Sequence, residues 1–201
     1  MIRLLLAEDQ AMVRGALATL LSLEPDLEVV GEVDRGDRVL GEARRTQPDV
    51  VLLDIEMPGR DGIAAAAEVT AALPACRVLI VTTFGRPGYL RRALAAGASG
   101  FLLKDAPASH LAAAIRRVHA GERVVDPDLA AAALAEGENP LTARERDVLV
   151  AARAHPTVAD VAAALYLSPG TVRNYLSSAM QKLGVGTRGE AVKAADERGW
   201  L

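Results

Sequence analysis

Short runs of aliphatic residues alternate with helical patterns over the first 120 residues of the chain. The aliphatic runs lie at 2–7, 27–33, 49–54, 77–82 and 100–104. Between them, apolar residues recur at spacings of three and four, as expected on one face of a helix. Strands that alternate with helices pair in parallel, and continuous aliphatic runs are typical of strands buried on both faces. The pattern therefore predicts a five-stranded, doubly wound α/β domain with a parallel, flavodoxin-like sheet.

The hydrophobic pattern changes after residue 120. Residues 121–140 contain no aliphatic strand and predict a linker with one short helix, which begins after Pro127 and stops at Gly137 and Pro140. From residue 141 the spacing is purely helical. It predicts a small all-α domain with helices at 142–154, 157–164, 169–183 and 187–198. We therefore expect domains at 1–120 and 141–201, joined by the linker at 121–140.

Helix starts in the C-terminal part carry capping signals. These are Thr142 with Glu145, Thr187 with Glu190, and Ser168 before Pro169. A threonine followed three residues later by glutamate predicts a capping box, and a proline suits the first turn of a helix. The four predicted helices therefore have local support besides their apolar spacing.

Composition narrows the class of protein. Half of the 201 residues are hydrophobic but only 3% are aromatic, which is typical of a globular core of alanine, leucine and valine. The single Cys76 cannot form an internal disulfide, and we interpret it as a core residue in a reducing compartment. The opening MIRLLLAEDQ is too short and too acidic for a signal peptide, and no run approaches the roughly 18 apolar residues of a membrane helix. We expect a cytoplasmic protein without membrane association.

Charge divides the chain into two unlike parts. Residues 1–140 hold 15 Lys and Arg against 20 Asp and Glu, whereas residues 141–201 hold 8 against 6. The stretch 168–188 contains Arg173, Lys182 and Arg188 and no acidic residue. This stretch is therefore the predicted surface for a polyanion.

Carboxylates follow the first and third predicted strands. The first aliphatic run is followed by Glu8 and Asp9, and the third ends on Asp54. In an open α/β sheet the ligand site lies outside the carboxyl ends of the strands. If the first and third strands are neighbours, the three acids converge. Such a cluster is tolerable when it holds a hard divalent cation, so the sequence predicts a Mg²⁺ site.

Two further polar residues end the other central strands. Thr82 closes the fourth strand and Lys104 closes the fifth. A hydroxyl and an ammonium at the same edge can bind phosphate oxygens, and an aspartate that attacks phosphorus forms an acyl phosphate. Each residue alone is more often a helix cap or a surface group. Their occurrence together favours phosphoryl transfer to Asp54.

These motifs resemble two-component response regulators of the NarL/FixJ type, which join a receiver domain to a LuxR-type helix-turn-helix. The resemblance covers nearly the whole chain. It rests on AED at 7–9, DIEMPGRDG at 54–62, VTTF at 81–84, GFLLK at 100–104, LTARERDVL at 141–149 and LSPGTVRNYLSSAMQKLGV at 167–185.

The resemblance implies a role for each matched receiver residue. Asp54 would be the phosphoacceptor for a histidine kinase, and Thr82 and Lys104 would hold the phosphoryl group. The Mg²⁺ ligands would be Glu8, Asp9, Asp54 and the backbone carbonyl of Glu56, and Phe101 would be the aromatic residue that reorients in switching.

The chain departs from its relatives at two places. Relatives often have proline after the lysine, commonly with a cis bond, whereas this chain has Asp105, before which a cis bond would cost about 3–4 kcal/mol. The second C-terminal helix reads TVADVAAAL and lacks the polar Asn-Lys-Glu start common in relatives. That change removes polar side chains that could contact the DNA backbone.

The helix that begins near Pro169 is the predicted recognition helix. Such a helix enters the major groove with its N-terminal end toward the bases. We expect Arg173, Asn174 and Ser177 to reach base edges, and Thr171, Lys182 and Arg188 to contact phosphates. The core-facing side carries Val172, Leu176, Met180 and Leu183. Without the motif, the polar residues would be interpreted simply as the solvated face of an amphipathic helix.

Two other functions remain as alternatives. A phosphatase or phosphotransferase of the haloacid-dehalogenase-like type needs a second aspartate two residues after the nucleophile, and this position is Glu56. A scaffold that only dimerises predicts a broken acidic cluster, and here the cluster is complete. We therefore expect a phosphorylation-controlled transcriptional regulator rather than an enzyme. It would form a homodimer on phosphorylation and bind double-stranded promoter DNA.

Overall fold

The computed structural model describes residues 1–83, 85–135 and 139–201. Phe84 of the VTTF motif and the predicted helix stop at Gly137 lie outside these residues. The chain divides into two compact units, one of residues 1–85 and 90–132, and the other of residues 86–89 and 133–201. Within the described residues, no helix has the length and apolar character needed to cross a membrane.

The first unit is built on a parallel sheet. Five strands lie where the aliphatic runs predict them: β1 (Ile2–Ala7), β2 (Leu27–Val33), β3 (Val50–Leu53), β4 (Arg77–Thr82) and β5 (Gly100–Leu103). The strand order is β2-β1-β3-β4-β5-β6, and all neighbours are parallel. β1 and β3 are therefore adjacent, as the prediction of a shared acidic site required. The predicted α/β fold is confirmed.

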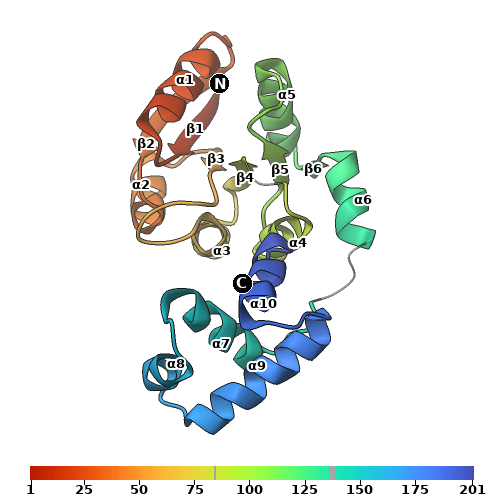
Figure 1. Cartoon of the computed structure of the whole chain (residues 1–201). Coiled ribbons are helices and arrows are strands. Elements are labelled where there is room, and N and C mark those ends of the chain that lie inside the picture. The colour runs from red at the N-terminus through yellow and green to blue at the C-terminus, as the bar shows by residue number, and fades with distance from the viewer. Residues whose placement is uncertain (84, 136–138) are drawn as a thin grey trace. The chain divides into compact units, whose positions relative to one another are not determined.

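Helices cover both faces of the sheet (Figure 1). They are α1 (Ala11–Ser22), the short 3-10 helix η1 (Gly36–Arg38), α2 (Val39–Thr46), α3 (Gly62–Ala72), α4 (Pro87–Ala95) and α5 (Ala108–His119). Figure 1 shows α1 and α5 on one face and α2, α3 and α4 on the other. Every residue of β3 is buried, because a strand covered on both faces has no solvent side.

A sixth strand, β6 (Val124–Val125), lies in the segment that we expected to be a linker without strands. It pairs with β5, with Val124 opposite Gly100 and Val125 opposite Phe101. The prediction of five strands is corrected to six, because a strand of two residues is too short to leave a hydrophobic pattern. The following helix α6 (Pro127–Ala135) begins at Pro127, as predicted.

The second unit contains four further helices. These are α7 (Ala143–Ala154), α8 (Val158–Leu165), α9 (Pro169–Leu183) and α10 (Arg188–Glu197), close to their predicted bounds. Both predicted capping boxes are present, and Thr157 with Asp160 forms another at the start of α8. The aliphatic residues of α7, α8 and α9 share one core with Ala191, Ala195 and Trp200.

Gly100 generates a test of the β6 position. A Cβ at Gly100 would lie 2.7 Å from Leu79 Cδ1 and 2.9 Å from the Val124 carbonyl oxygen. We expect Gly100→Ala to lower the free energy of unfolding of the first unit by about 1–3 kcal/mol, because the packed strands must move apart. Urea denaturation followed by circular dichroism measures this change.

The control is Gly41→Ala in α2, where an added Cβ meets no atom within 4 Å. Alanine favours the helix there, so this variant should gain about 0.5–1 kcal/mol. A Gly100→Ala protein as stable as the control variant would contradict the pairing of β6 with β5.

Candidate functional site

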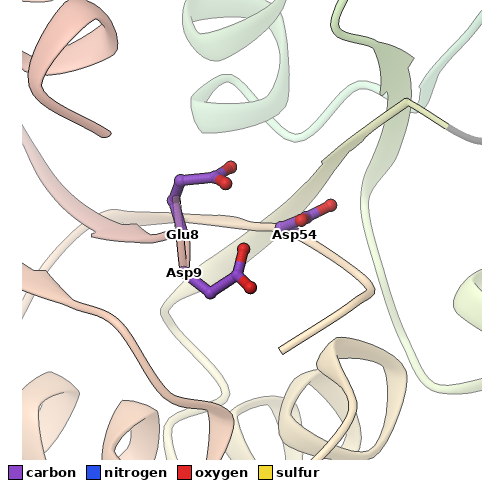
Figure 2. A group of neighbouring side chains, drawn as sticks. All are labelled: Glu8, Asp9 and Asp54. Atoms are coloured by element: carbon purple, nitrogen blue, oxygen red, sulfur yellow. The ribbon is translucent and has the colours of Figure 1, made fainter. Parts of the chain in front are cut away.

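Three carboxylates meet at the carboxyl edge of the sheet. Glu8 and Asp9 follow β1, Asp54 follows β3, and one oxygen of each lies within 4.8 Å of the others. Figure 2 shows these side chains at the ends of the two neighbouring strands. Glu8 and Asp54 are only 2% and 5% exposed, whereas Asp9 is exposed. Two buried acids and one exposed acid thus form a concentrated patch of negative charge.

Lys104 is the cation of this cluster. Its Nζ lies 2.5 Å from Glu8 Oε2 and 3.0 Å from Asp54 Oδ2. Burial alone would lower the pKa of Lys104, but the hydrogen bond to Glu8 and the charge of Asp54 outweigh burial and raise it. Burial and the charge of Asp54 together raise the pKa of Glu8 by more than its contacts with Lys104 and the Gln10 amide lower it. The ammonium therefore stays charged and compensates part of the acidic cluster.

Backbone contacts fix the loop that carries Asp54. Asp54 Oδ1 accepts a hydrogen bond from the Ile55 amide at 2.8 Å, and the Gly62 amide donates to the Ile55 carbonyl at 2.8 Å. A Cβ at Gly62 would lie 1.8 Å from the Asp54 carbonyl oxygen. Only glycine permits this approach. Gly62 is the last residue of the motif DIEMPGRDG, but the sequence alone does not indicate its role.

Arg14 is a second residue that sequence reasoning missed. Its guanidinium donates to the Glu8 carbonyl at 2.6 Å, while the Gln10 amide donates to Glu8 Oε1 at 3.2 Å. These contacts fix the backbone and side chain of Glu8 at the end of β1. An arginine on a helix normally indicates only a solvent-facing position, so the sequence contains no signal for this contact.

The remaining predicted receiver residues lie around the same edge. Thr82 is completely buried, and its carbonyl accepts a hydrogen bond from the Lys104 amide at 2.9 Å. Phe101 is completely buried on β5, between Ile80 on β4 and Val125 on β6. Glu56 is exposed on the loop after β3. Among the described residues no peptide bond is cis, so the bond from Lys104 to Asp105 is trans.

The α9 helix presents a polar face to solvent. Ser168 caps its start by accepting a hydrogen bond from the Thr171 amide at 3.1 Å. Arg173, Asn174 and Ser177 are exposed. The opposite side packs into the core through Val172, Leu176 and Leu183, which are buried, and Met180, which is partly buried. This division follows the predicted faces of the helix.

Comparison with known families decides the identity of the two units. Residues 4–116 match the family model of the response regulator receiver domain, and residues 139–195 match that of the bacterial regulatory proteins of the luxR family. The chain belongs to the LuxR-family response regulators. It is a two-component response regulator with a receiver domain and a DNA-binding domain, and it regulates transcription.

Whole-length relatives agree with this assignment. The chain is 47% identical over 201 residues to the transcriptional regulatory protein YvfU of Bacillus subtilis, and 45% identical over 201 residues to DesR of the same organism. Both alignments cover 100% of each chain. The crystal structure of the response regulator ChrA is similar, with 34% identity, a TM-score of 0.59, and coverage of 100% of this chain and 98% of ChrA.

Lys182 of this response regulator is engaged inside its own domain. Its Nζ lies 2.7 Å from Glu145 Oε2, and Ser178 Oγ donates to Glu145 Oε1 at 2.6 Å. The Thr142 amide also donates to Glu145 at 2.6 Å. Burial raises the pKa of Glu145, but these hydrogen bonds outweigh burial and lower it to about 2. The buried Glu145 carboxylate thus ties the start of α7 to α9.

Arg188 likewise makes contacts within the domain. Its guanidinium donates to the carbonyl oxygens of Ala152 at 2.5 Å and Pro156 at 2.9 Å, and also to that of His155. These carbonyls lie at the C-terminal end of α7, where a helix leaves acceptors without partners. A lysine ammonium carries three N–H groups and an arginine guanidinium five, so a phosphate contact by Lys182 or Arg188 would use the donors that remain beside these internal contacts. Both residues belong to the stretch that the sequence predicts as a polyanion surface. A count of charges cannot show that a cation has a partner elsewhere in the same domain.

The Glu145 network predicts a pH-dependent loss of stability. Because the folded-state pKa is lowered from 4.5 to about 2, the stabilisation is present above pH 4.5 and is lost as the pH falls toward 2. We expect Glu145→Gln to lower the free energy of unfolding of the DNA-binding domain by about 1–3 kcal/mol at pH 7. The difference from the wild type should narrow below pH 4.5.

Chemical denaturation at a series of pH values measures this difference. Glu197→Gln is the control, because Glu197 is 60% exposed and lies 3.8 Å from Lys193. An exposed pair of this kind contributes less than about 1 kcal/mol. A difference for Glu145→Gln that stayed constant from pH 7 to pH 3 would contradict the assigned network.

Proposed function

We propose that a histidine kinase transfers a phosphoryl group to Asp54 and thereby controls DNA binding by this regulator. A carboxylate oxygen of Asp54 attacks phosphorus as the bond from phosphorus to the kinase histidine breaks. The imidazole leaves and takes up a proton, and Asp54 becomes an acyl phosphate. The observation that carries this proposal is the position of Asp54. It lies beside two other acids and the ammonium of Lys104, at the C-terminal ends of the parallel strands.

The acidic cluster suits Mg²⁺. Glu8, Asp9 and Asp54 offer three carboxylate oxygens within 4.8 Å of one another, and hard cations prefer oxygen ligands. Lys104 compensates only one of the three negative charges. We propose that these acids hold Mg²⁺ together with the backbone carbonyl of Glu56. The bound ion would supply positive charge beside the phosphoryl oxygens.

Thr82 and Lys104 are proposed to bind the transferred group. Thr82 ends β4, which pairs with β3, and Lys104 follows β5, which pairs with β4, so both residues lie at the C-terminal ends of the parallel strands. The Lys104 ammonium, which now contacts Glu8 and Asp54, would turn part of its donor capacity to the phosphoryl oxygens. We propose that Phe101, on the strand that ends just before Lys104, changes its side-chain orientation with this rearrangement.

The first test is covalent labelling. Treatment of the full chain with a small phosphodonor and Mg²⁺ should add one phosphate with the lability of an acyl phosphate, because Asp54 is the nucleophile. Asp54→Asn should abolish labelling, and Asp9→Asn or EDTA should slow it. Intact-protein mass spectrometry follows the reaction.

Asp105→Asn provides the matched control, because Asp105 is an exposed acid next to Lys104. This variant should be labelled at the wild-type rate. Equal labelling of Asp54→Asn and the wild type would refute the assigned phosphoacceptor, and equal rates with and without EDTA would refute the metal role.

Exposed apolar residues on α1 and at its C-terminal cap, Leu23, support the proposed homodimer. Met12, Leu20 and Leu23 are 88%, 44% and 75% exposed. Leu20 also lines a hollow together with Leu111 of α5 and with Lys104. A rearrangement of Lys104 can therefore reach the surface that carries these side chains. We propose that phosphorylation raises the fraction of dimer by favouring one of two receiver states.

The exposed face of α9 supports the proposed contacts with promoter DNA. Arg173, Asn174 and Ser177 would reach base edges in the major groove. Phosphates would be contacted by Thr171, Lys182 and Arg188, the last two through donors that their internal contacts leave over. A dimer would bind an inverted repeat whose half-sites lie about one helical turn apart.

The proposed organisation follows from these assignments. We propose a receiver at 1–120, a linker at 121–140 and a DNA-binding domain at 141–201; the two family matches, at 4–116 and 139–195, support this division. Binding to the promoter requires a cytoplasmic location. We propose that the protein is not an enzyme that turns over phosphoesters, since Glu56 occupies the place of the second aspartate that the haloacid-dehalogenase mechanism needs.

Paired variants test the coupling between the domains. Arg173→Ala should reduce the preference for an operator over mixed-sequence DNA by about 5- to 150-fold, because a bidentate contact to guanine is worth about 1–3 kcal/mol. Its phosphorylation-driven dimerisation should be unchanged. Asp54→Asn should lose the response to phosphodonor yet retain weak basal binding. Anisotropy titrations measure binding, and analytical ultracentrifugation measures the dimer.

Arg144→Ala is the control for charge, since Arg144 is an exposed cation of the same domain that lies on α7. It should retain the operator preference. An Arg173→Ala protein with normal preference, or a phosphorylated protein that stays monomeric on and off DNA, would refute the coupling.

A further inference from the structure

Tyr166 is an aromatic residue whose side chain is exposed to solvent. Its exposed fraction is 98%, whereas Phe101 and Trp200 are buried and Tyr175 packs partly against the core of the DNA-binding domain. Only 3% of the chain is aromatic, so a large ring left in solvent is unusual for this protein. Burial therefore does not explain why tyrosine occupies this position.

The backbone at Tyr166 does not favour tyrosine either. Tyr166 caps the C-terminal end of α8 with φ 56° and ψ 41°, in the left-handed region. The Leu167 amide donates to the Ala162 carbonyl at 2.9 Å, which closes the turn. Glycine and asparagine adopt this conformation at lower cost than a residue with a bulky side chain. Tyr166 is thus unfavourable for the local backbone and contributes little packing.

The position of Tyr166 suggests what it contacts. It lies two residues before Ser168, the cap of α9, in the turn between the two helices. In a helix-turn-helix the first helix crosses the DNA backbone and the second enters the groove with its N-terminal end leading. The first turn of α9 contains no acidic residue that would repel a phosphate. An exposed side chain in this turn is therefore placed toward the phosphates at the edge of the groove.

We propose that Tyr166 is an additional DNA-binding residue, whose phenol O–H donates a hydrogen bond to a backbone phosphate. Tyrosine makes such contacts in protein–DNA interfaces, and they position the protein without reading sequence. Because the phenol is neutral, the contact adds affinity without releasing a counterion. This inference rests on the proposed binding of DNA through α9.

The test uses the full chain and a labelled mixed-sequence duplex of about three helical turns, because a phosphate contact needs no operator. Affinity is measured by anisotropy at several low salt concentrations. Tyr166→Phe should weaken binding about 3- to 10-fold, the effect of losing one hydrogen bond, while the slope of affinity against salt stays unchanged. Val150→Ala is the control, since Val150 is a 49% exposed side chain on α7, and it should bind like the wild type.

Tyr166→Asn separates the contact from a structural role. Asparagine tolerates the left-handed turn, so this variant should unfold a few degrees higher than the wild type yet bind the duplex at least as weakly as Tyr166→Phe. Wild-type affinity in Tyr166→Phe would overturn the inference about Tyr166 and would leave the proposed function untouched. A Tyr166→Asn protein that lost both stability and affinity would also overturn it, because tyrosine would then serve the turn. A wild-type chain that bound no DNA would overturn the proposed function itself.

Discussion

The receiver depends on the balance between three carboxylates and one ammonium at the edge of its sheet. The parallel order places the ends of β1 and β3 side by side, so Glu8, Asp9 and Asp54 must share one small volume. Three carboxylates this close together repel one another, and the burial of Glu8 and Asp54 adds the cost of removing two charges from water. Lys104 offsets part of the repulsion by contacting two of the acids. The cluster is thus stable enough to fold and still has net negative charge available for a cation.

The two buried glutamates, Glu8 in the receiver and Glu145 in the DNA-binding domain, differ in how fully their negative charge is compensated. Glu8 shares the ammonium of Lys104 with Asp54, and its pKa is raised by burial. Glu145 accepts hydrogen bonds from Lys182, Ser178 and the Thr142 amide, and its pKa is lowered to about 2. The same side chain is under-compensated in the receiver and fully compensated in the DNA-binding domain. Under the proposed phosphorylation, new charge on Asp54 would therefore act where the existing balance is incomplete, while Glu145 gives α9 a fixed support.

Local sequence signals account for most of the fold and for the position of the acidic site. Continuous aliphatic runs located five strands, and threonine and serine caps located the helix starts of the second unit. The acids converge because strand ends meet wherever parallel strands are adjacent. What the sequence did not indicate depends on contacts between distant residues: the pairing of β6 with β5, the approach of Gly62 to Asp54, and the bond from Arg14 to Glu8. A two-residue strand, a glycine in a turn and an arginine on a helix each leave no pattern from which a tertiary partner can be inferred.

The internal contacts of Lys182 and Arg188 also limit how the DNA-binding domain can obtain affinity. The sequence offers Arg173, Lys182 and Arg188 between residues 168 and 188, but two of these cations already bind Glu145 or backbone carbonyls. Lys182 is ion-paired with Glu145, and this stretch offers only three cations, so we expect a single domain to displace few counterions and to have a small electrostatic affinity for DNA. Neutral donors near the N-terminal end of α9 gain importance for the same reason. A second copy held on the same DNA adds effective concentration without any new charge. Under the proposed function, weak binding by one domain would therefore allow a change in the receiver's dimer fraction to control occupancy of the promoter.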